Sequence, residues 1–441
     1  MRNLLKYFGL VGLAGGVGLG VACSASSGNV MGTGGAGGSG AAGGGVPETT
    51  GTGQGGDLGF GGAGMTGTGT GTTTTTGVPC DAEPGEDKDG DGFTITAGDC
   101  NDCDTNVNPN AVEVIGGQDG TGGGDYLPAD EDCDMQVDEP AESCDEGLAV
   151  NDTNAMNAAK AVELCKQSAG PNDWGVTSAQ WVKANGSPPP TKSTELANFH
   201  RGHGFVSGFG PNVMVRAGHR MLAVSSGTGR QPSDTGYSSP SGFIKGYSGQ
   251  HPQGFPKESA ACPGVITGSP YDPTAVELEI RVPSNAYGFS FNFKFYTFEW
   301  PQYICYEYND FFVAILSPIP QGQTDGQISF DNQGNPVSVN NAFLDVCGCS
   351  NGPPCTAGGK VFQCPLGTSE LVGTGFTNHA ATSWLKTTAP AEPNTLIRIR
   401  WGAYDSGDGT LDSTALVDNW QWIAEPGTTV GTNPDPPDEP R

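Results

Sequence analysis

The sequence predicts a mainly β protein: an antiparallel, jelly-roll-like β-sandwich with one short helix, preceded by a disordered Gly/Thr-rich tether and a small irregular acidic metal-binding module. Two observations carry this prediction. Apolar and polar residues alternate with period two along residues 276–282 and 289–296, as in strands with one buried face. Further short strand-like runs follow, with Gly, Pro, Asn and Asp between them and almost no helical periodicity.

Residues 1–22 have the features of an export signal. Arg2 and Lys6 precede an apolar run that is short for a membrane span, and Ala22 stands directly before Cys23. The residues LGVAC, which end at Cys23, resemble a bacterial lipobox, and the resemblance implies a diacylglyceryl group on Cys23. We therefore expect an exported protein that a lipid anchors to the outer membrane or cell surface of a Gram-negative bacterium. Ordinary secretion is the alternative.

Residues 23–79 are mostly Gly, Thr, Ser and Ala, without Lys or Arg. Such a segment cannot bury enough apolar surface to offset the chain entropy lost on folding, so we predict a disordered tether. The chain carries 48 Asp and Glu against 20 Lys and Arg, a net charge of −28, and residues 80–146 hold 21 of these acids beside a single Lys. This balance argues against nucleic acid and anionic lipid headgroups as partners and favours cations.

Apart from the cysteine of the lipobox, twelve cysteines remain. An even number in an exported chain predicts that they pair as disulfides. Cys347, Cys349, Cys355 and Cys364 crowd one Gly/Pro-rich loop, which predicts a disulfide-stapled loop rather than a zinc site because no histidine lies within it. We expect Cys305, in the aromatic segment, to be half of another disulfide.

The acidic module is expected at residues 80–146. It contains DKDGDGFT at 87–94, where aspartates alternate before a glycine as at the start of an EF-hand loop. The twelfth loop position is Gly98 rather than Glu, which excludes an EF-hand. Together with GDCNDCDTNVNPNA at 98–111 and DEDCDMQVDEP at 130–140, the segment resembles the metal-binding repeats of MopE-type bacterial surface proteins.

The resemblance implies a set of metal-binding residues: Asp87, Asp89, Asp91, Asp99, Asn101, Asp102, Asp104, Asp132, Asp134, Asp138 and Glu139. The segment departs from the family pattern at Asn101 and Met135, by an extra Cys103, and by a Gly-rich insertion after Val114. So many carboxylates in a weakly apolar segment repel one another unless cations neutralise them, and oxygen ligands favour Ca²⁺. Copper, to which the family is linked by name, is the second choice, because the segment has no histidine and its cysteines should be oxidised. The alternative is a disulfide-pinned acidic linker that binds nothing tightly.

Residues 147–425 are expected to form the sandwich domain, followed by a disordered Pro-rich tail at 426–441. Apolar residues at helical spacing predict the one short helix within 151–168. Strands are predicted at 174–182, 221–226, 276–282, 289–296, 311–316, 371–373, 383–386, 396–404 and 414–423. The run at 311–316 is continuously apolar, so we expect it to be covered on both faces.

Several segments resemble the choice-of-anchor L domain of bacterial surface proteins. They are the aromatic series at 289–316 and the residues at 331–347, 370–377, 381–391 and 403–422. This family is named for the varied means by which its members are attached to the cell, among which is a lipobox. The resemblance therefore implies a location and an architecture rather than a reaction.

Two groups of carboxylates in the sandwich are candidates for chemistry. Glu299, Glu307 and Asp310 lie on the connection around Pro301, and three aspartates lie in DSGDGTLD at 405–412. A candidate second ion site comprises Glu307, Asp310, Asp405, Asp408 and Asp412. In the alternative interpretation, DSGDG is a turn whose aspartates accept hydrogen bonds from their own backbone.

The sequence contains no nucleophile elbow, HExxH motif, P-loop or dinucleotide fingerprint, and we assign no catalytic residue. We predict a non-enzymatic cell-surface lipoprotein with a calcium-stabilised acidic module and a β-sandwich for adhesion or ligand binding. The ligand would be a glycan, a matrix component or another surface protein. The alternative is an extracellular carboxylate-dependent hydrolase that acts on polysaccharide.

Overall fold

The computed structural model describes residues 80–115, 128–331, 334–340 and 344–435. The expected signal peptide, the lipidation site Cys23 and the expected tether lie outside these ranges. No helix within them has the length and apolar character needed to cross a lipid bilayer.

Two antiparallel sheets form the body of the protein. The smaller has the order β1-β4-β12-β6, with β1 at Gly175–Val182, β4 at Pro270–Arg281, β12 at Leu396–Ser406 and β6 at Phe311–Ser317. The larger follows the path β14-β11-β5-β13-β3-β2, formed by Gly431–Pro434, Leu385–Pro390, Gly288–Thr297, Ser413–Ile423, Met221–Ser225 and His203–Val206. The short strands β10 (Ala380–Ala381) and β7 (Val346–Cys347) extend it beside β5. The mainly β, antiparallel fold class predicted from the sequence is confirmed.

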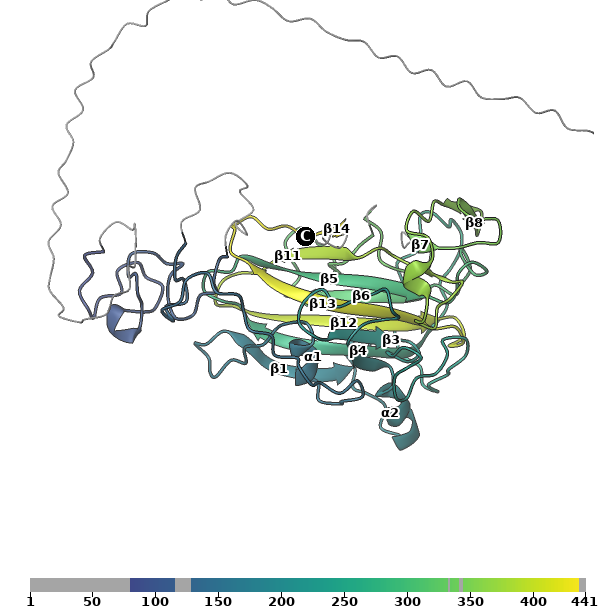
Figure 1. Ribbon diagram of the computed structural model, residues 1–441, viewed down its shortest axis with the longest axis horizontal. Helices are drawn as coiled ribbons and strands as arrows, with labels where there is room; N and C mark the ends of the chain where they lie inside the picture. The colour runs from purple at the N-terminus through teal and green to yellow at the C-terminus, as the bar shows by residue number, and fades with distance from the viewer. Residues whose placement is uncertain (1–79, 116–127, 332–333, 341–343, 436–441) are drawn as a thin grey trace, which may run out of the picture. The chain divides into compact units, whose positions relative to one another are not determined.

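Few elements lie outside these sheets in the described chain. They are the hairpin of β8 (Cys355–Ala357) and β9 (Lys360–Phe362), the helices α1 (Met156–Lys160) and α2 (Ser193–Phe199), and two single 3₁₀ turns, η1 (Ile95–Ala97) and η2 (Ser369–Leu371). In Figure 1 the long strands β4, β5, β12 and β13 run along one another, with α1 and α2 on the side of β1. The helix expected within 151–168 is thus confirmed as α1, whereas α2 was not predicted.

The sheets face each other across one aromatic core. Phe291 of β5 meets the ring of Trp401 in β12 at 5.3 Å between centroids, and Phe293 stacks on Phe312 of β6 at 4.9 Å. All four side chains are fully buried. Because aromatic side chains bury the most apolar surface per residue, these contacts account for much of the attraction between the sheets.

Strand β4 has the half-buried character that its alternation predicts. Val276, Leu278 and Ile280 are buried, whereas Glu277 and Glu279 lie on the partly exposed face. Each glutamate is directly opposite an arginine of β12, Arg400 and Arg398, and accepts hydrogen bonds from it. Opposite charges at facing positions also favour this register over a slip by one residue, which would turn the apolar side chains towards solvent.

Strand β5 differs from its prediction because it is buried on both faces. Lys294, on the face turned away from the main core, is fully buried, donates to the carbonyl oxygen of Thr382 and forms an ion pair with Glu370 at 2.6 Å. A second apolar cluster covers the same face, including Phe209, Tyr296 and Phe376. Chain segments distant in the sequence therefore cover a face that the alternation predicts to be exposed.

Three of the expected elements differ in the structure. Residues 371–373 are not a strand, because Leu371 closes the 3₁₀ turn η2. The strand expected at 383–386 begins later, as β11. The expected disordered tail is ordered in part: β14 adds to the edge of β11, with the hydroxyls of Thr387 and Thr432 3.0 Å apart.

The twelve cysteines of the described chain form six disulfides. These are Cys80–Cys103, Cys100–Cys133, Cys144–Cys165, Cys262–Cys305, Cys347–Cys364 and Cys349–Cys355. The disulfide-stapled loop and the pairing of the cysteine in the aromatic segment are thereby confirmed. With every one of these sulfurs in a disulfide, no thiolate of the described chain can bind a soft metal.

Candidate metal centre and adjoining cleft

The acidic module is fastened to the sandwich through the turn at NPNA. Ser284, in the connection between β4 and β5, donates its backbone N–H to the carbonyl oxygen of Asn110 at 3.0 Å and its hydroxyl to Asn108 at 2.8 Å. Asn285 exchanges two hydrogen bonds with the backbone of Val112, at 2.8 and 2.9 Å. These asparagines are almost fully buried, so the turn is a docking element rather than a free loop.

Four aspartates form a first cluster: Asp89, Asp91, Asp99 and Asp102. In each, Oδ1 accepts a backbone N–H, from Asp91, Phe93, Asn101 and Lys88 respectively, at 2.7–3.2 Å. In each, Oδ2 is buried and finds no hydrogen-bond partner among the residues that the structure describes. Carboxylate oxygens of Asp89, Asp99 and Asp102 lie within 4.8 Å of one another. In each carboxylate, one oxygen therefore stabilises the loop through a backbone hydrogen bond, and the other is available to a ligand.

The electrostatics of this cluster are unfavourable without a positive partner. Burial, together with the charges of Asp91, Asp89 and Asp102, raises the pKa of Asp99 to about 6. Burial, the largest cause, also raises the pKa of Asp89 and of Asp91, with neighbouring carboxylates adding to it. A divalent cation between the free oxygens would remove both costs at once.

Three other predicted ligands in this part of the module have local roles. Asp87 lies beside Asp89 and Asp91, but its two oxygens accept the N–H groups of Gly90 and Gly92 at 2.8 and 3.1 Å. The exposed Asp104 accepts both the backbone and side-chain N–H of Asn106 at 3.1 Å. Asn101 contributes its backbone N–H to Asp99. The alternating aspartates thus divide into loop-forming groups and groups that face the centre.

Glu113 is the centre of a second cluster that sequence reasoning missed. Its oxygens lie within 4.8 Å of those of Asp132 and Glu139 and, in another grouping, of Glu131 and Asp138. Burial raises the pKa of Glu113 to about 7. Glu113 lies outside the acidic motifs, in the apolar run that follows the NPNA turn, so no pattern singled it out. Three predicted ligands, Asp132, Asp138 and Glu139, are thus brought together around an unpredicted residue.

Asp134, the remaining predicted ligand, does not belong to this second cluster. It is exposed, and its two oxygens accept the backbone and side-chain N–H groups of Gln136, both at 2.8 Å. Both clusters consist of carboxylates alone, a ligand set that suits hard cations.

A cleft of about 620 Å³ adjoins the second cluster. Its walls come from the module, from the segment around α1 and from β13, and include Glu113, Asp132, Glu139, Glu163, Lys166, Trp174, Asn419, Trp420, Gln421 and Trp422. The rings of Trp174 and Trp422 meet edge to face at 6.3 Å, and the Lys166 ammonium lies 4.7 Å from the Trp174 ring centroid. The cleft therefore combines aromatic surface, side-chain amides and carboxylates.

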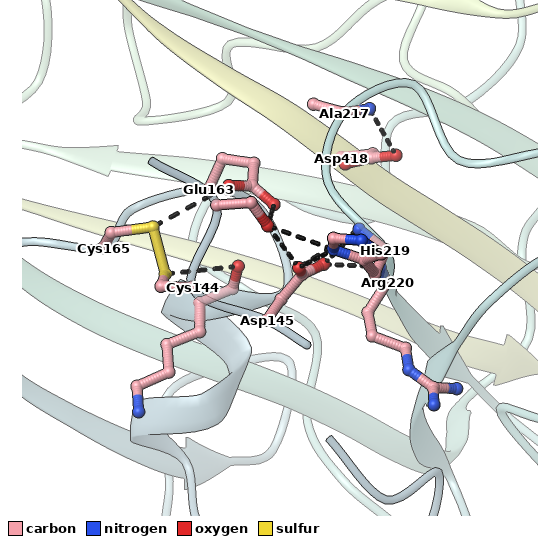
Figure 2. A network of polar contacts seen from close by, with 10 residues as sticks. Cys144, Asp145, Glu163, Cys165, Ala217, His219, Arg220 and Asp418 are labelled. Atoms are coloured by element: carbon pink, nitrogen blue, oxygen red, sulfur yellow. Dashed lines mark hydrogen bonds and ion pairs between the residues drawn. A yellow bond between two sulfur atoms is a disulfide. The ribbon is translucent and has the colours of Figure 1, made fainter. Parts of the chain in front are cut away.

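A buried aspartate, Asp145, lies behind Glu163 of the cleft wall, and Figure 2 shows the hydrogen bonds that Asp145 accepts from His219 and Arg220. Burial tends to raise the pKa of Asp145, but hydrogen bonds from Ser143, His219 and Arg220 hold it below its usual value. Burial and the negative charge of Asp145 raise the pKa of the neighbouring Glu163 to about 7. Gly218 has φ 56°, and a Cβ there would overlap the Glu163 carboxylate, so only glycine allows this approach.

The residues of the candidate second ion site do not form a single site in the structure. Glu307 and Asp408 are exposed, whereas Asp310, Asp405 and Asp412 are buried. The exposed Asp408 accepts the N–H of Thr410 two residues ahead, as in the alternative interpretation of this loop as a self-capping turn. Glu299, which was not included among the predicted ligands, is buried with the other three.

Comparison with known proteins identifies no relative: no family model, no curated protein and no solved structure matches this chain.

We predict that Asp99→Asn weakens calcium binding by at least about 10-fold, because it removes one of the charged oxygens that face the first centre. Isothermal titration of the mature chain with CaCl₂ would measure the change. Asp104→Asn is the matched control, since Asp104 is exposed and holds only its own turn, and it should titrate as the wild type does. Equal affinities for the wild type and Asp99→Asn would contradict this assignment.

Proposed function

We propose that the protein is an exported, lipid-anchored, non-enzymatic surface protein in which the acidic module binds calcium and the β-sandwich binds a ligand. The observation that carries the calcium part is the set of four buried Oδ2 atoms, on Asp89, Asp91, Asp99 and Asp102, without a partner in the described chain. The lipobox-like residues before Cys23 and the resemblances to MopE-type repeats and to the choice-of-anchor L domain support the location.

Calcium is favoured by the ligands and by the compartment. Carboxylates are hard oxygen donors, and flexible loops rich in them suit the larger coordination number of Ca²⁺ better than the strict octahedron of Mg²⁺. Extracellular calcium modules work with dissociation constants on the order of 10⁻⁴ to 10⁻³ M, which a loop as exposed as 87–104 can reach. Copper stays the second choice because neither cluster offers imidazole or thiolate.

Bound calcium would shape the surface that the sandwich presents. The disulfide Cys100–Cys133 joins the loop of the first centre to the segment of the second, and the second centre forms part of the cleft wall. A cation between Asp132 and Glu139 would fix this wall. Glu113 is a positioning residue, because both of its oxygens accept backbone N–H groups, from Glu131, Asp132 and Asp138. The module thereby acts as a calcium-dependent support for a binding site that it shares with the sandwich.

The ligand that suits the cleft best is a glycan. Aromatic rings such as Trp422 offer flat apolar surface to the C–H faces of a sugar, and Asn419 and Gln421 offer both donors and acceptors to its hydroxyls. Such a mixture of apolar walls with a few polar groups is typical of small-ligand sites. This assignment makes the protein an adhesin, or a receptor for polysaccharide, at the cell surface.

One observation favours the alternative, an extracellular hydrolase acting on polysaccharide. Glu113 and Glu163 both line the cleft, and both have a pKa raised to about 7 by burial, as a general acid requires. Among the carboxylates of the sandwich that the sequence offered for this role, Glu307 and Asp408 are exposed but do not line the cleft. Asp310, Asp405 and Asp412 are buried too deeply to touch a polymer.

We predict that Trp422→Ala weakens binding to a polysaccharide panel by about 30-fold, the usual cost of truncating a central aromatic contact. Tyr306→Ala is the control, because Tyr306 is an exposed aromatic residue that does not line the cleft. Binding would be measured by affinity electrophoresis, and turnover by release of reducing ends. Turnover that Glu163→Gln abolishes would overturn the non-enzymatic assignment.

We also predict that Cys23→Ala abolishes acylation and moves the protein from the membrane fraction to the soluble fraction. Growth with a radioactive fatty acid, followed by cell fractionation, would test this. Label that persists in the Cys23→Ala variant would contradict the lipid anchor, as would a wild-type mature protein without label.

A further inference from the structure

Four carboxylates meet inside the sandwich, at one end of both sheets. Glu299 follows β5, Asp310 precedes β6, Asp405 lies near the end of β12, and Asp412 precedes β13. Because β5 pairs with β13 and β12 pairs with β6 in antiparallel fashion, these positions belong to the same edge. Each of the four residues is at most 2% exposed. We refer to these residues as the inner acidic cluster.

Hydrogen bonds hold the members of the inner acidic cluster close together. Asp310 accepts the backbone N–H of Ser406 at 3.1 Å through Oδ1 and the hydroxyl of Ser413 at 2.7 Å through Oδ2. These donors are the immediate chain neighbours of Asp405 and Asp412. The backbone N–H of Phe298, the residue before Glu299, donates to the carbonyl oxygen of Asp412 at 3.1 Å. Asp310 therefore bridges the two strands that bring the other carboxylates together.

Three oxygens of the inner acidic cluster have no hydrogen-bond partner in the described part of the chain. They are Oε2 of Glu299 and Oδ2 of Asp405 and of Asp412. A buried polar atom without a partner costs free energy, and a buried carboxylate costs much more. Three such oxygens from three separate strand ends are not explained by the packing of the sandwich.

The charge of Lys245 acts on Asp405 and Asp412, but its ammonium group makes its hydrogen bonds with other residues. Its buried ammonium group donates to the carbonyl oxygen of Ser225 at 2.9 Å and to the hydroxyl of Thr274 at 2.6 Å, and it also faces Asp272. One ammonium cannot neutralise Asp272 and the four acids of the inner cluster. Burial, strengthened by Asp405, Asp408 and Asp412, raises the pKa of Glu299 to about 9, and burial raises the pKa of Asp310 well above its usual range.

From this geometry we infer that the inner acidic cluster binds one Ca²⁺ ion through Glu299, Asp405 and Asp412. Asp310 is a positioning residue, since both of its oxygens are engaged by Ser406 and Ser413. The ion would tie the connection between β5 and β6 to the connection between β12 and β13, which crosses from one sheet to the other. This site is independent of the acidic module, so either assignment can fail without the other.

The test asks whether the change in Tm caused by Glu299→Gln has opposite signs with and without calcium. In millimolar CaCl₂, Glu299→Gln should lower the Tm of the mature chain by about 5 °C, because it removes a charged ligand. In chelator the same change should raise Tm, because it replaces a buried, unpaired carboxyl by a neutral amide of the same shape. Equilibrium dialysis with ⁴⁵Ca should show the loss of one ion per chain.

Two variants keep the result interpretable. Glu307→Gln, at an exposed position of the connection between β5 and β6, should keep the wild-type stoichiometry and Tm under both conditions. Asp405→Asn should repeat the reversal of sign if Glu299→Gln does not fold. Wild-type stoichiometry together with a raised Tm in both calcium and chelator would overturn the inference, and would assign the inner acidic cluster to protonated carboxyls alone.

Discussion

Repulsion among buried carboxylates is the physical constraint on which the structure of the acidic module and of the inner acidic cluster depends. In both the acidic module and the inner acidic cluster, one oxygen of an aspartate is bound to the backbone while the other is buried and unpaired within the described chain. Asp91 is an example from the acidic module, and Asp405 is an example from the inner acidic cluster. Neither arrangement is stable as a set of free anions, because desolvation and mutual repulsion act in the same direction. In the proposed function, bound cations would resolve this conflict and would explain why loops with so little apolar surface have a defined form.

The sandwich provides the rigid frame for these loops. The aromatic core between β5 and β12 fixes the strand ends, and the connection between β4 and β5 receives the acidic module through Ser284 and Asn285. Disulfides then shorten the free path of the chain within the module, which limits the conformations that unpaired loops can adopt. In this arrangement the module, the segment that follows α1, and β13 line one cleft, so a cation in the module could influence a ligand bound there.

Much of the fold could be predicted because its signals are local. Strand β4 follows from alternation alone, and β6 from a continuous apolar run, since side-chain periodicity reports directly on which faces are covered. The double burial of β5 could not be predicted in this way. Lys294 looks like a solvent-facing residue, and only the distant Glu370 and Thr382 make its burial tolerable. Strand β14 was missed for a related reason, because an edge strand held by backbone pairing and threonine hydroxyls needs no apolar pattern.

The sequence likewise predicted the site residues that lie close together in the chain and missed those that only the fold brings together. The regular spacing of Asp89 and Asp91 marked the first centre, because its ligands are close in the sequence. Glu113 and Glu299 were not predicted as members of the carboxylate clusters, because each is a single acid in an apolar or aromatic run and acquires its partners through the fold. The spacing in DSGDG suggested that Asp408 belongs with Asp405, yet the turn directs one outwards and the other inwards.

The central claim is that cations hold the acidic module in its folded, docked form. Hydrogen–deuterium exchange of the mature chain in calcium and in chelator tests it most directly. The account predicts that the amides of Lys88, Phe93 and Asn101, which donate to the cluster aspartates, and that of Ser284, at the docking turn, are protected in calcium and exchange much faster in chelator. Equal exchange of these amides under the two conditions would contradict it.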